Sequence, residues 1–198
     1  GKTIFLDTKS NKIESFDHNL CDMIIGVSNK PKDTQGLLRK LKENSLKSIE
    51  TVKDRLTDFN LYDVENINII SHLDFLEDYL KPYFKAAVGN YKITMDAKKE
   101  FLNSNLNINK ISELMNSHHN YLKDDLKITT PEIDKMIDVS FENGAVGSKI
   151  VGSGGGGSIV SLSTNSNTSN KIVSELKSIG VKDAFIARKG KGPTIYYE

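Results

Sequence analysis

The sequence predicts an α+β fold in which helices cover one face of a small antiparallel sheet. The middle of the chain repeats apolar residues at spacings of three and four, which is the period of an amphipathic helix. Both ends instead contain short apolar runs bounded by turn-forming residues, which are typical of strands. Helices beside antiparallel strands form an α+β domain.

Composition narrows the functional class. The chain has 198 residues, 37% hydrophobic and 27% charged, as in an ordinary globular protein. With 27 basic and 26 acidic residues, it has no basic excess for a nucleic-acid partner. No apolar run approaches the length of a membrane span, and no secretory signal is visible. The single cysteine, Cys21, excludes a disulfide framework and indicates a reducing cytoplasm. We expect Cys21 to be a buried thiol, not a nucleophile.

The first third of the chain predicts strands and then a long helix. Thr3–Leu6 and Met23–Val27 are apolar runs expected to form strands. A helix is expected over residues 38–59, where apolar side chains share one face. The chain begins at Gly1, without methionine, and enters the first strand at once, which suggests a fragment or a processed chain.

Three start signals predict the central helices. Ser71 and Asp74 resemble a capping box, which would open a helix over residues 75–80. Pro82 suits the first turn of the next helix. Asn107 is expected to cap a third.

The C-terminal part predicts one more helix and then strands. Thr129–Glu132 is a strong helix start, and Gly144 is expected to end that helix. Strands are expected at Val146–Val151 and Ser158–Ser163. A polar loop over residues 164–170 and a helix over residues 171–179 should follow. Asp183–Arg188 and Thr194–Tyr197 are expected to form a last strand pair.

Gly152–Ser158 reads GSGGGGS and has three interpretations. It could be a flexible tether, but only about 40 residues follow it, and apolar residues adjoin both ends. It could be a hairpin turn that touches no ligand, but such a turn needs only one or two glycines. Each further glycine costs roughly 0.5–1 kcal/mol relative to alanine. We therefore favour a turn whose backbone approaches phosphate oxygens.

Other polar residues are better explained without catalysis. His118 and His119 point about 100° apart on a helix and cannot share a metal ion alone, so one is expected to be hydrogen-bonded in the core. Asp124 and Asp125 are flanked by lysines and are expected at a solvated helix end. Lys149 precedes the glycines, and a strand-surface lysine is favoured over a phosphate contact. No metal site is predicted.

Several stretches resemble the GHMP small-molecule kinases, which include galactokinase, homoserine kinase, mevalonate kinase and phosphomevalonate kinase. GAVGSKIVGSGGGGSIVSL (Gly144–Leu162) resembles the third conserved motif of that family. Leu114–Asp138 is similar to the galactokinase stretch before it, where Ser-His, Leu-x-Asp-Asp and Pro-Glu-Leu-Asp recur in this order. Phe84–Asn103 and Gly1–Phe16 resemble galactokinase segments more loosely.

The resemblance implies a domain division and a partial site. Residues 29–198 would form the ferredoxin-like C-terminal domain, and residues 1–28 a strand pair ending the N-terminal domain. The reaction would be ATP- and Mg²⁺-dependent phosphorylation of a small-molecule hydroxyl, on a sugar first and mevalonate second. The residues expected near the ATP phosphates are Gly152, Ser153, Gly154, Gly155, Gly156 and Gly157.

The rest of the active site would come from the missing N-terminal half. In the family, the main nucleotide loop, the catalytic aspartate and a substrate-activating basic residue all lie upstream of the segments that match this chain. We therefore expect no catalytic residue in this chain, and no activity from it alone.

The sequence also departs from the galactokinase pattern. Galactokinases carry a sugar-holding tyrosine in the region aligning with Asp33–Lys40, and this chain has none there. That region and the closing residues 178–198 resemble mevalonate kinases as much. A mevalonate-type kinase, a non-catalytic ligand-binding or regulatory protein with the kinase fold, and an unrelated small α+β module are the alternatives.

Overall fold

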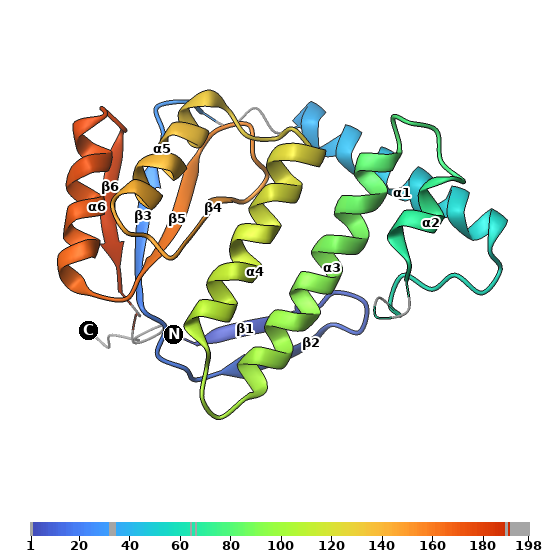
Figure 1. Cartoon of the computed structure of the whole chain (residues 1–198), viewed down its shortest axis with the longest axis horizontal. Helices are drawn as coiled ribbons and strands as arrows, with labels where there is room; N and C mark the ends of the chain where they lie inside the picture. Colours follow the sequence, from blue (N-terminus) through green and yellow to red (C-terminus); the bar gives the residue numbers. More distant parts are fainter. Residues whose placement is uncertain (1, 32–34, 64, 66, 189, 191–198) are drawn as a thin grey trace, which may run out of the picture.

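The computed structural model describes residues 2–31, 35–63, 65, 67–188 and 190. Its strands form two antiparallel sheets (Figure 1). The smaller is a hairpin of β1 (Thr3–Asp7) and β2 (Lys12–Phe16), with Leu6 opposite Ile13. The α+β class is confirmed.

The larger sheet has four strands in the order β4-β5-β3-β6. Their bounds are Asp22–Val27 for β3, Gly147–Val151 for β4, Ser158–Ser163 for β5 and Asp183–Ala187 for β6. Every neighbouring pair is antiparallel, and β3 lies between β5 and β6. β3, from the first part of the chain, thus lies inside a sheet whose other strands all come from residues 147–187.

The helices fall into two groups. Next to the four-stranded sheet lie α4 (Ile108–Asn120), α5 (Pro131–Glu142) and α6 (Ser166–Ser178). Farther out lie α1 (Gln35–Arg55), α2 (Ile69–Leu73) and α3 (Lys81–Leu102). In Figure 1 the hairpin lies at the lower ends of α3 and α4. None of the helices in the described part of the chain has an apolar stretch suited to crossing a membrane.

Two apolar cores hold these layers together. The first joins α5 and α6 to the four-stranded sheet through fully buried side chains, among them Ile24, Met136 and Leu176. The second joins α1 to α3 and includes Val52 and Phe84. Full burial of one such side chain contributes about 1.5–3 kcal/mol, so each core stabilises its own group of elements.

Three helix starts predicted from the sequence are confirmed, one of them by Pro82 in the first turn of α3. The Asn107 side chain accepts a hydrogen bond from the Lys110 N–H at 3.1 Å, at the start of α4. The Thr130 hydroxyl accepts a hydrogen bond from the Ile133 N–H at 3.3 Å, and Pro131 lies in the first turn of α5. Gly144 has φ +96° and follows the end of α5, as expected of a helix terminator.

Three helix predictions were wrong. Asn68, not Ser71, caps α2, and this helix ends at Leu73 instead of running on to Leu80. α1 ends at Arg55 and does not continue to Phe59. The ring centroid of Phe59 lies 5.9 Å from that of Phe84 in α3. Asn165 caps α6, so this helix begins at Ser166 within the segment expected to be a loop.

The strand predictions also changed. β2 was not predicted, and it takes the place beside β1. The two strands expected within residues 1–28 therefore do not pair with each other, because β3 pairs with β5 and β6. The domain division at residue 28 stays a prediction. Thr194–Tyr197 lies outside the described residues.

Candidate functional site

The glycine run forms the loop of a β-hairpin. Val151 of β4 pairs with Ser158 of β5, so residues 152–157 only connect two adjacent strands. This pairing rules out a tether between independent bodies. Five glycines of the loop adopt positive φ: Gly152, Gly154, Gly155, Gly156 and Gly157. We call residues 152–157 the glycine turn.

One side of the glycine turn rests on Ile128. The Gly155 N–H donates to the Ile128 carbonyl at 2.8 Å. A Cβ on Gly154 would lie 2.6 Å from the same carbonyl oxygen, closer than any side chain tolerates. Ile128 itself is buried in the first apolar core. The glycine turn is therefore held against the backbone of a buried core residue.

The other side rests on the segment that follows β3. The Gly157 N–H donates to the Lys30 carbonyl at 3.2 Å, and Ser28 N–H donates to the Gly157 carbonyl at 2.7 Å. A Cβ on Gly156 would lie 2.9 Å from the Lys30 oxygen. The glycine turn is thus held between two stretches of backbone.

Glu132 in turn holds that segment. The backbone N–H of Asn29 donates to the Glu132 carboxylate at 2.8 Å, and the Asn29 side-chain amide donates to the Gly180 carbonyl at 2.7 Å. Glu132 lies in the first turn of α5, where a carboxylate also interacts favourably with the helix dipole. Residues 28–31 are therefore tied to α5 as well as to the glycine turn.

These contacts change the reasoning about the glycines. Positive φ and the close approach of Ile128 and Lys30 require glycine here without any ligand. Gly154 and Gly156 are buried, whereas Gly152 is exposed and Ser153 and Gly155 are half-buried. The outward part of the turn consequently presents backbone and one hydroxyl, from Ser153, and this is the surface open to a ligand.

Lys149 does not reach along β4 into the glycine turn. Its Nζ donates to the Ile150 carbonyl at 2.8 Å, and burial lowers its pKa. It lies beside His118, whose pKa falls to about 4, first because of burial and then because of the Lys149 charge. The strand lysine that we expected is therefore half-buried.

The core histidine is His119, which is 5% exposed. Its Nδ1 lies 3.5 Å from the Ile150 N–H of β4 as a long hydrogen-bond acceptor. Burial lowers its pKa. The expectation of one hydrogen-bonded core histidine is confirmed, with His119 in that place. His118 lines a cavity instead.

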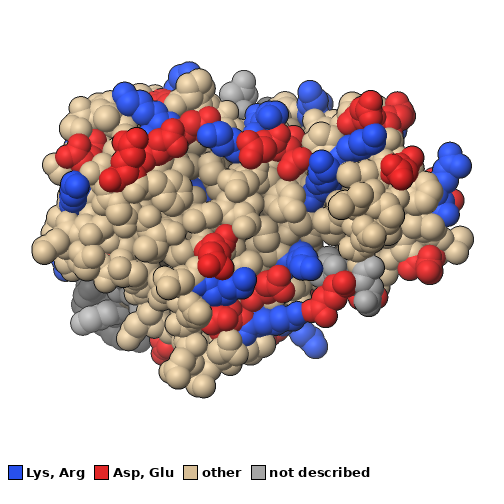
Figure 2. Space-filling view, in the orientation of Figure 1, with Lys and Arg blue, Asp and Glu red and all other residues tan. Residues whose placement is uncertain are grey.

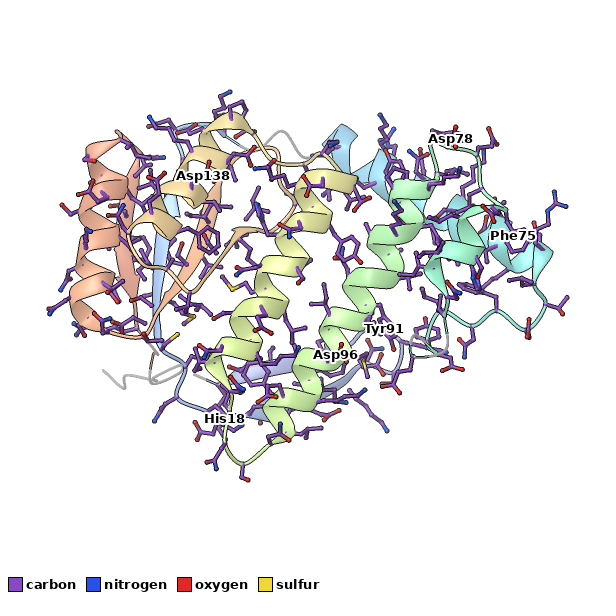
Figure 3. The ribbon with its side chains drawn as sticks, viewed as in Figure 1. His18, Phe75, Asp78, Tyr91, Asp96 and Asp138 are labelled. Carbon is purple, nitrogen blue, oxygen red and sulfur yellow. The ribbon has the colours of Figure 1, made fainter. Side chains whose placement is uncertain are left out.

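Asp124 and Asp125 lie in a π-helical turn, Tyr121–Asp125, that continues α4. Burial raises the pKa of Asp125, so this helix end is less solvated than expected. Carboxylates elsewhere are dispersed, as Figure 3 shows for Asp96 on α3 and Asp138 on α5. Among the described residues, no three His, Cys, Asp or Glu side chains are grouped to hold a metal ion.

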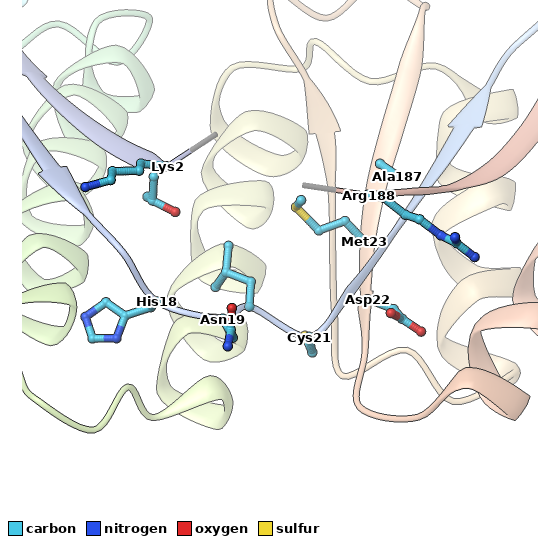
Figure 4. Close-up of a pocket in the computed structure, with 10 residues that line it drawn as sticks. Lys2, His18, Asn19, Cys21, Asp22, Met23, Ala187 and Arg188 are labelled. Atoms are coloured by element: carbon cyan, nitrogen blue, oxygen red, sulfur yellow. The ribbon is translucent and has the colours of Figure 1, made fainter. Parts of the chain in front are cut away.

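Two cavities lie away from the glycine turn. One, of about 440 Å³, is lined by residues that include Lys2, His18, Cys21 and Arg188 (Figure 4). Cys21 is half-buried there, not fully buried as expected, and burial raises its pKa. The other, of about 540 Å³, lies between the β1–β2 hairpin and helices α3 and α4.

Charge on the surface is mixed. On the face shown in Figure 2, Lys and Arg side chains alternate with Asp and Glu along the upper and lower margins. This mixture agrees with the net charge of +1.

The sequence did not identify Ile128, Glu132 or the 28–31 segment as neighbours of the glycine turn. Their only local signal was the strong helix start at Thr130, two residues after Ile128.

Comparison with known proteins shows which family this chain resembles. A family model described as GHMP kinases C terminal matches residues 98–182. The galactokinase of Lactococcus lactis subsp. lactis is 28% identical over 203 residues, which cover 98% of this chain and 50% of the relative. A galactokinase of Clostridium perfringens (strain SM101 / Type A) is 27% identical over 208 residues, covering 98% and 52%.

Solved structures agree. The crystal structure of Lactococcus lactis galactokinase complexed with galactose matches with a TM-score of 0.80 and 26% identity, covering 98% of this chain and 52% of that one. The L. major mevalonate kinase in complex with R-mevalonate matches with a TM-score of 0.62 at 16% identity over 94% and 48%, which shows a shared fold. The chain spans about half the length of the curated relatives it matches. Residues 98–182 therefore match the C-terminal domain of the GHMP kinases, and the chain is similar, over nearly its whole length, to one half of a galactokinase.

Proposed function

We propose that this chain is the C-terminal half of an ATP-dependent kinase that phosphorylates a sugar hydroxyl, with galactose as the first candidate. The observation that carries the proposal is the match to a galactokinase structure over 98% of the chain. The similarity to mevalonate kinases at 16% identity concerns the fold, so mevalonate ranks second. A cytoplasmic location stays a prediction.

Within that kinase, we assign the glycine turn to the ATP phosphates. Bound ATP supplies the phosphoryl group, and catalysis of its transfer depends mainly on positioning and charge stabilisation. Gly154 and Gly156 are buried against Ile128 and Lys30, whereas the other four residues of the turn, Gly152, Ser153, Gly155 and Gly157, are not fully buried. A phosphate oxygen can approach them because no side chain larger than serine stands in the turn.

The other half would supply the remaining parts of the site. The described residues offer no cluster for a divalent cation, so we assign Mg²⁺ to the phosphates and to that half. The catalytic aspartate and the main nucleotide loop are assigned to it as well, through the family resemblance. This chain then closes the phosphate site and forms one wall of the substrate pocket.

The β1–β2 hairpin is the surface that we assign to the preceding half. Ile4, Leu6 and Ile13 are 60%, 49% and 66% exposed, and they alternate along the two strands on one face. An isolated two-stranded hairpin is only marginally stable in water, so a further layer over this face would stabilise it. This supports grouping the β1–β2 hairpin with the N-terminal domain, whereas β3 belongs to the four-stranded sheet.

The test of function is an acceptor panel with the complete kinase. ATP turnover is measured with galactose, glucose and mevalonate in turn, alongside binding of each by calorimetry. We expect turnover with galactose. Turnover with mevalonate alone would indicate a mevalonate-type kinase instead. Because the sugar-holding tyrosine is missing, a non-catalytic protein is the other alternative. Binding of ATP and galactose without turnover would establish it.

A further inference from the structure

A π-helical turn separates α4 from the residue that seats the glycine turn. α4 ends at Asn120, and in Tyr121–Asp125 the hydrogen bonds widen: the Leu126 N–H donates to the Tyr121 carbonyl at 3.0 Å. The Ile128 N–H then reaches back to the Leu122 carbonyl at 3.0 Å. Such single π turns are rare and often occur at functional sites.

Lys127 completes this change of direction. Its φ is +53°, in the left-handed region that residues other than glycine rarely adopt. The reversal ends the helix and directs Ile128 back into the first apolar core. The Ile128 carbonyl is thereby left to accept the Gly155 N–H at 2.8 Å. The backbone conformation of Lys127 thus places one of the two backbone stretches that hold the glycine turn.

The start of the π-helical turn is fixed from a different element. A Cβ on Gly89 of α3 would lie 2.3 Å from Cζ of the Tyr121 ring, so this ring packs directly on the helix backbone. Tyr121 is half-buried, and burial raises its pKa. The register from Tyr121 to Ile128 is therefore set at both ends.

We propose that Lys127 is a positioning residue, whose left-handed conformation after the π-helical turn sets the glycine turn for the nucleotide phosphates. The proposal rests on the nucleotide role proposed above. Lys127 does not itself need to touch ATP. It acts through the Ile128 carbonyl, and it makes the shape of the site depend on a residue outside the glycine turn.

The test compares Lys127→Val with Lys127→Gly. Both remove the lysine charge, but only valine resists positive φ, because its branched Cβ clashes with the backbone there. Amide hydrogen exchange of residues 152–158 is measured in this 198-residue chain. We expect exchange on the order of tenfold faster in Lys127→Val, and within about twofold of the parent in Lys127→Gly.

Asn11 provides the matched control. It also has positive φ, +55°, but lies in the β1–β2 loop, away from the glycine turn. Asn11→Val should strain the backbone equally and leave exchange of residues 152–158 unchanged. Equal acceleration by Lys127→Val and Asn11→Val would indicate general loosening and overturn the proposal. Equal exchange in the two Lys127 variants would overturn it too.

A kinetic measurement separates this proposal from the proposed function. In the complete kinase, Lys127→Val should raise KM for ATP about tenfold while KM for the sugar stays unchanged, and Lys127→Gly should restore the parent value. Faster exchange with an unchanged KM for ATP would refute the nucleotide part of the proposal. If the complete protein has no kinase turnover, the proposed function fails, and the exchange comparison still decides whether Lys127 positions the turn.

Discussion

Two buried glycines determine the seat of the glycine turn. A Cβ on Gly154 would lie 2.6 Å from the Ile128 oxygen, and one on Gly156 would lie 2.9 Å from the Lys30 oxygen. Both oxygens belong to backbone, which cannot move aside as a flexible side chain can. Each contact is therefore an absolute limit on side-chain size, independent of any ligand.

Gly154→Ala should destabilise the chain by about 1–3 kcal/mol, because the substitution adds both a clash and an unfavourable positive φ, +77°. Gly36→Ala is the matched control. Gly36 lies in α1 with nothing near its Cβ position, so alanine should stabilise by about 0.4–1 kcal/mol. Urea unfolding measures both. A neutral Gly154→Ala would show that the turn can shift away from Ile128.

His118 makes stability depend on pH. Its pKa falls from 6.5 to about 4 in the folded chain, mainly through burial and further through Lys149 of β4 and the adjacent His119. The unfolded chain therefore takes up a proton first. The corresponding stability is present above about pH 6.5 and is lost as pH falls towards 4.

His118→Gln should remove that part of the pH dependence. We expect the free energy of unfolding of the parent to fall by roughly 2 kcal/mol more than that of the variant between neutral pH and pH 4, after allowance for partial exposure of the ring. Carboxylates titrate in the same range, but they are common to both proteins. Denaturant unfolding at several pH values measures the difference, and parallel curves would contradict the assignment.

At the scale of elements, the start of α5 serves both fold and site. Thr130 caps the helix, while Glu132 in its first turn accepts hydrogen bonds from Asn29 at 2.8 and 3.2 Å. Asn29 is followed directly by Lys30, whose carbonyl holds Gly157. α5 therefore supports the glycine turn through this segment.

Glu132→Ala should loosen residues 28–31 and cost about 1 kcal/mol, because the Asn29 N–H loses its acceptor. Glu132→Gln keeps a carbonyl oxygen in that place and should cost less than half as much. Amide exchange of Asn29 and urea unfolding check the pair. Equal losses in the two variants would mean that the carboxylate charge, not the acceptor, matters.

Local signals explain which elements could be predicted. Asn107 and Thr130 were found because a cap and its helix are adjacent in sequence. The prediction of a cap at Ser71 was wrong because the side chain of Asn68, three residues earlier, caps this helix instead. β2 was missed because Lys12–Phe16 has few apolar residues and gains its strand form from pairing with β1. Strand propensity depends on such context.

The candidate site was predictable only in part. The glycine turn and its flanking strands are local and were placed correctly. Ile128 and Lys30 could not be assigned to it, because nothing local indicates a contact with residues roughly 30 and 130 positions away. The π-helical turn has no clear sequence pattern, and the left-handed Lys127 contradicts the usual preference of lysine.

At the scale of the whole molecule, the hairpin face should behave differently in this chain and in the complete protein. Ile13 is 66% exposed here, so Ile13→Thr should change the stability of this chain by less than about 0.5 kcal/mol. If the other half covers the face, the same change should destabilise the complete protein by about 1 kcal/mol or more. Parallel unfolding measurements test this, and equal effects would contradict the assigned interface.

We propose that the glycine turn lies against the ATP phosphates. Amide hydrogen exchange of residues 152–158 in the complete protein, with and without a non-hydrolysable ATP analogue whose binding is confirmed by calorimetry, is the most direct test. We expect added protection in the glycine turn, on the order of tenfold or more. Unchanged exchange of these residues while the analogue is bound would contradict it.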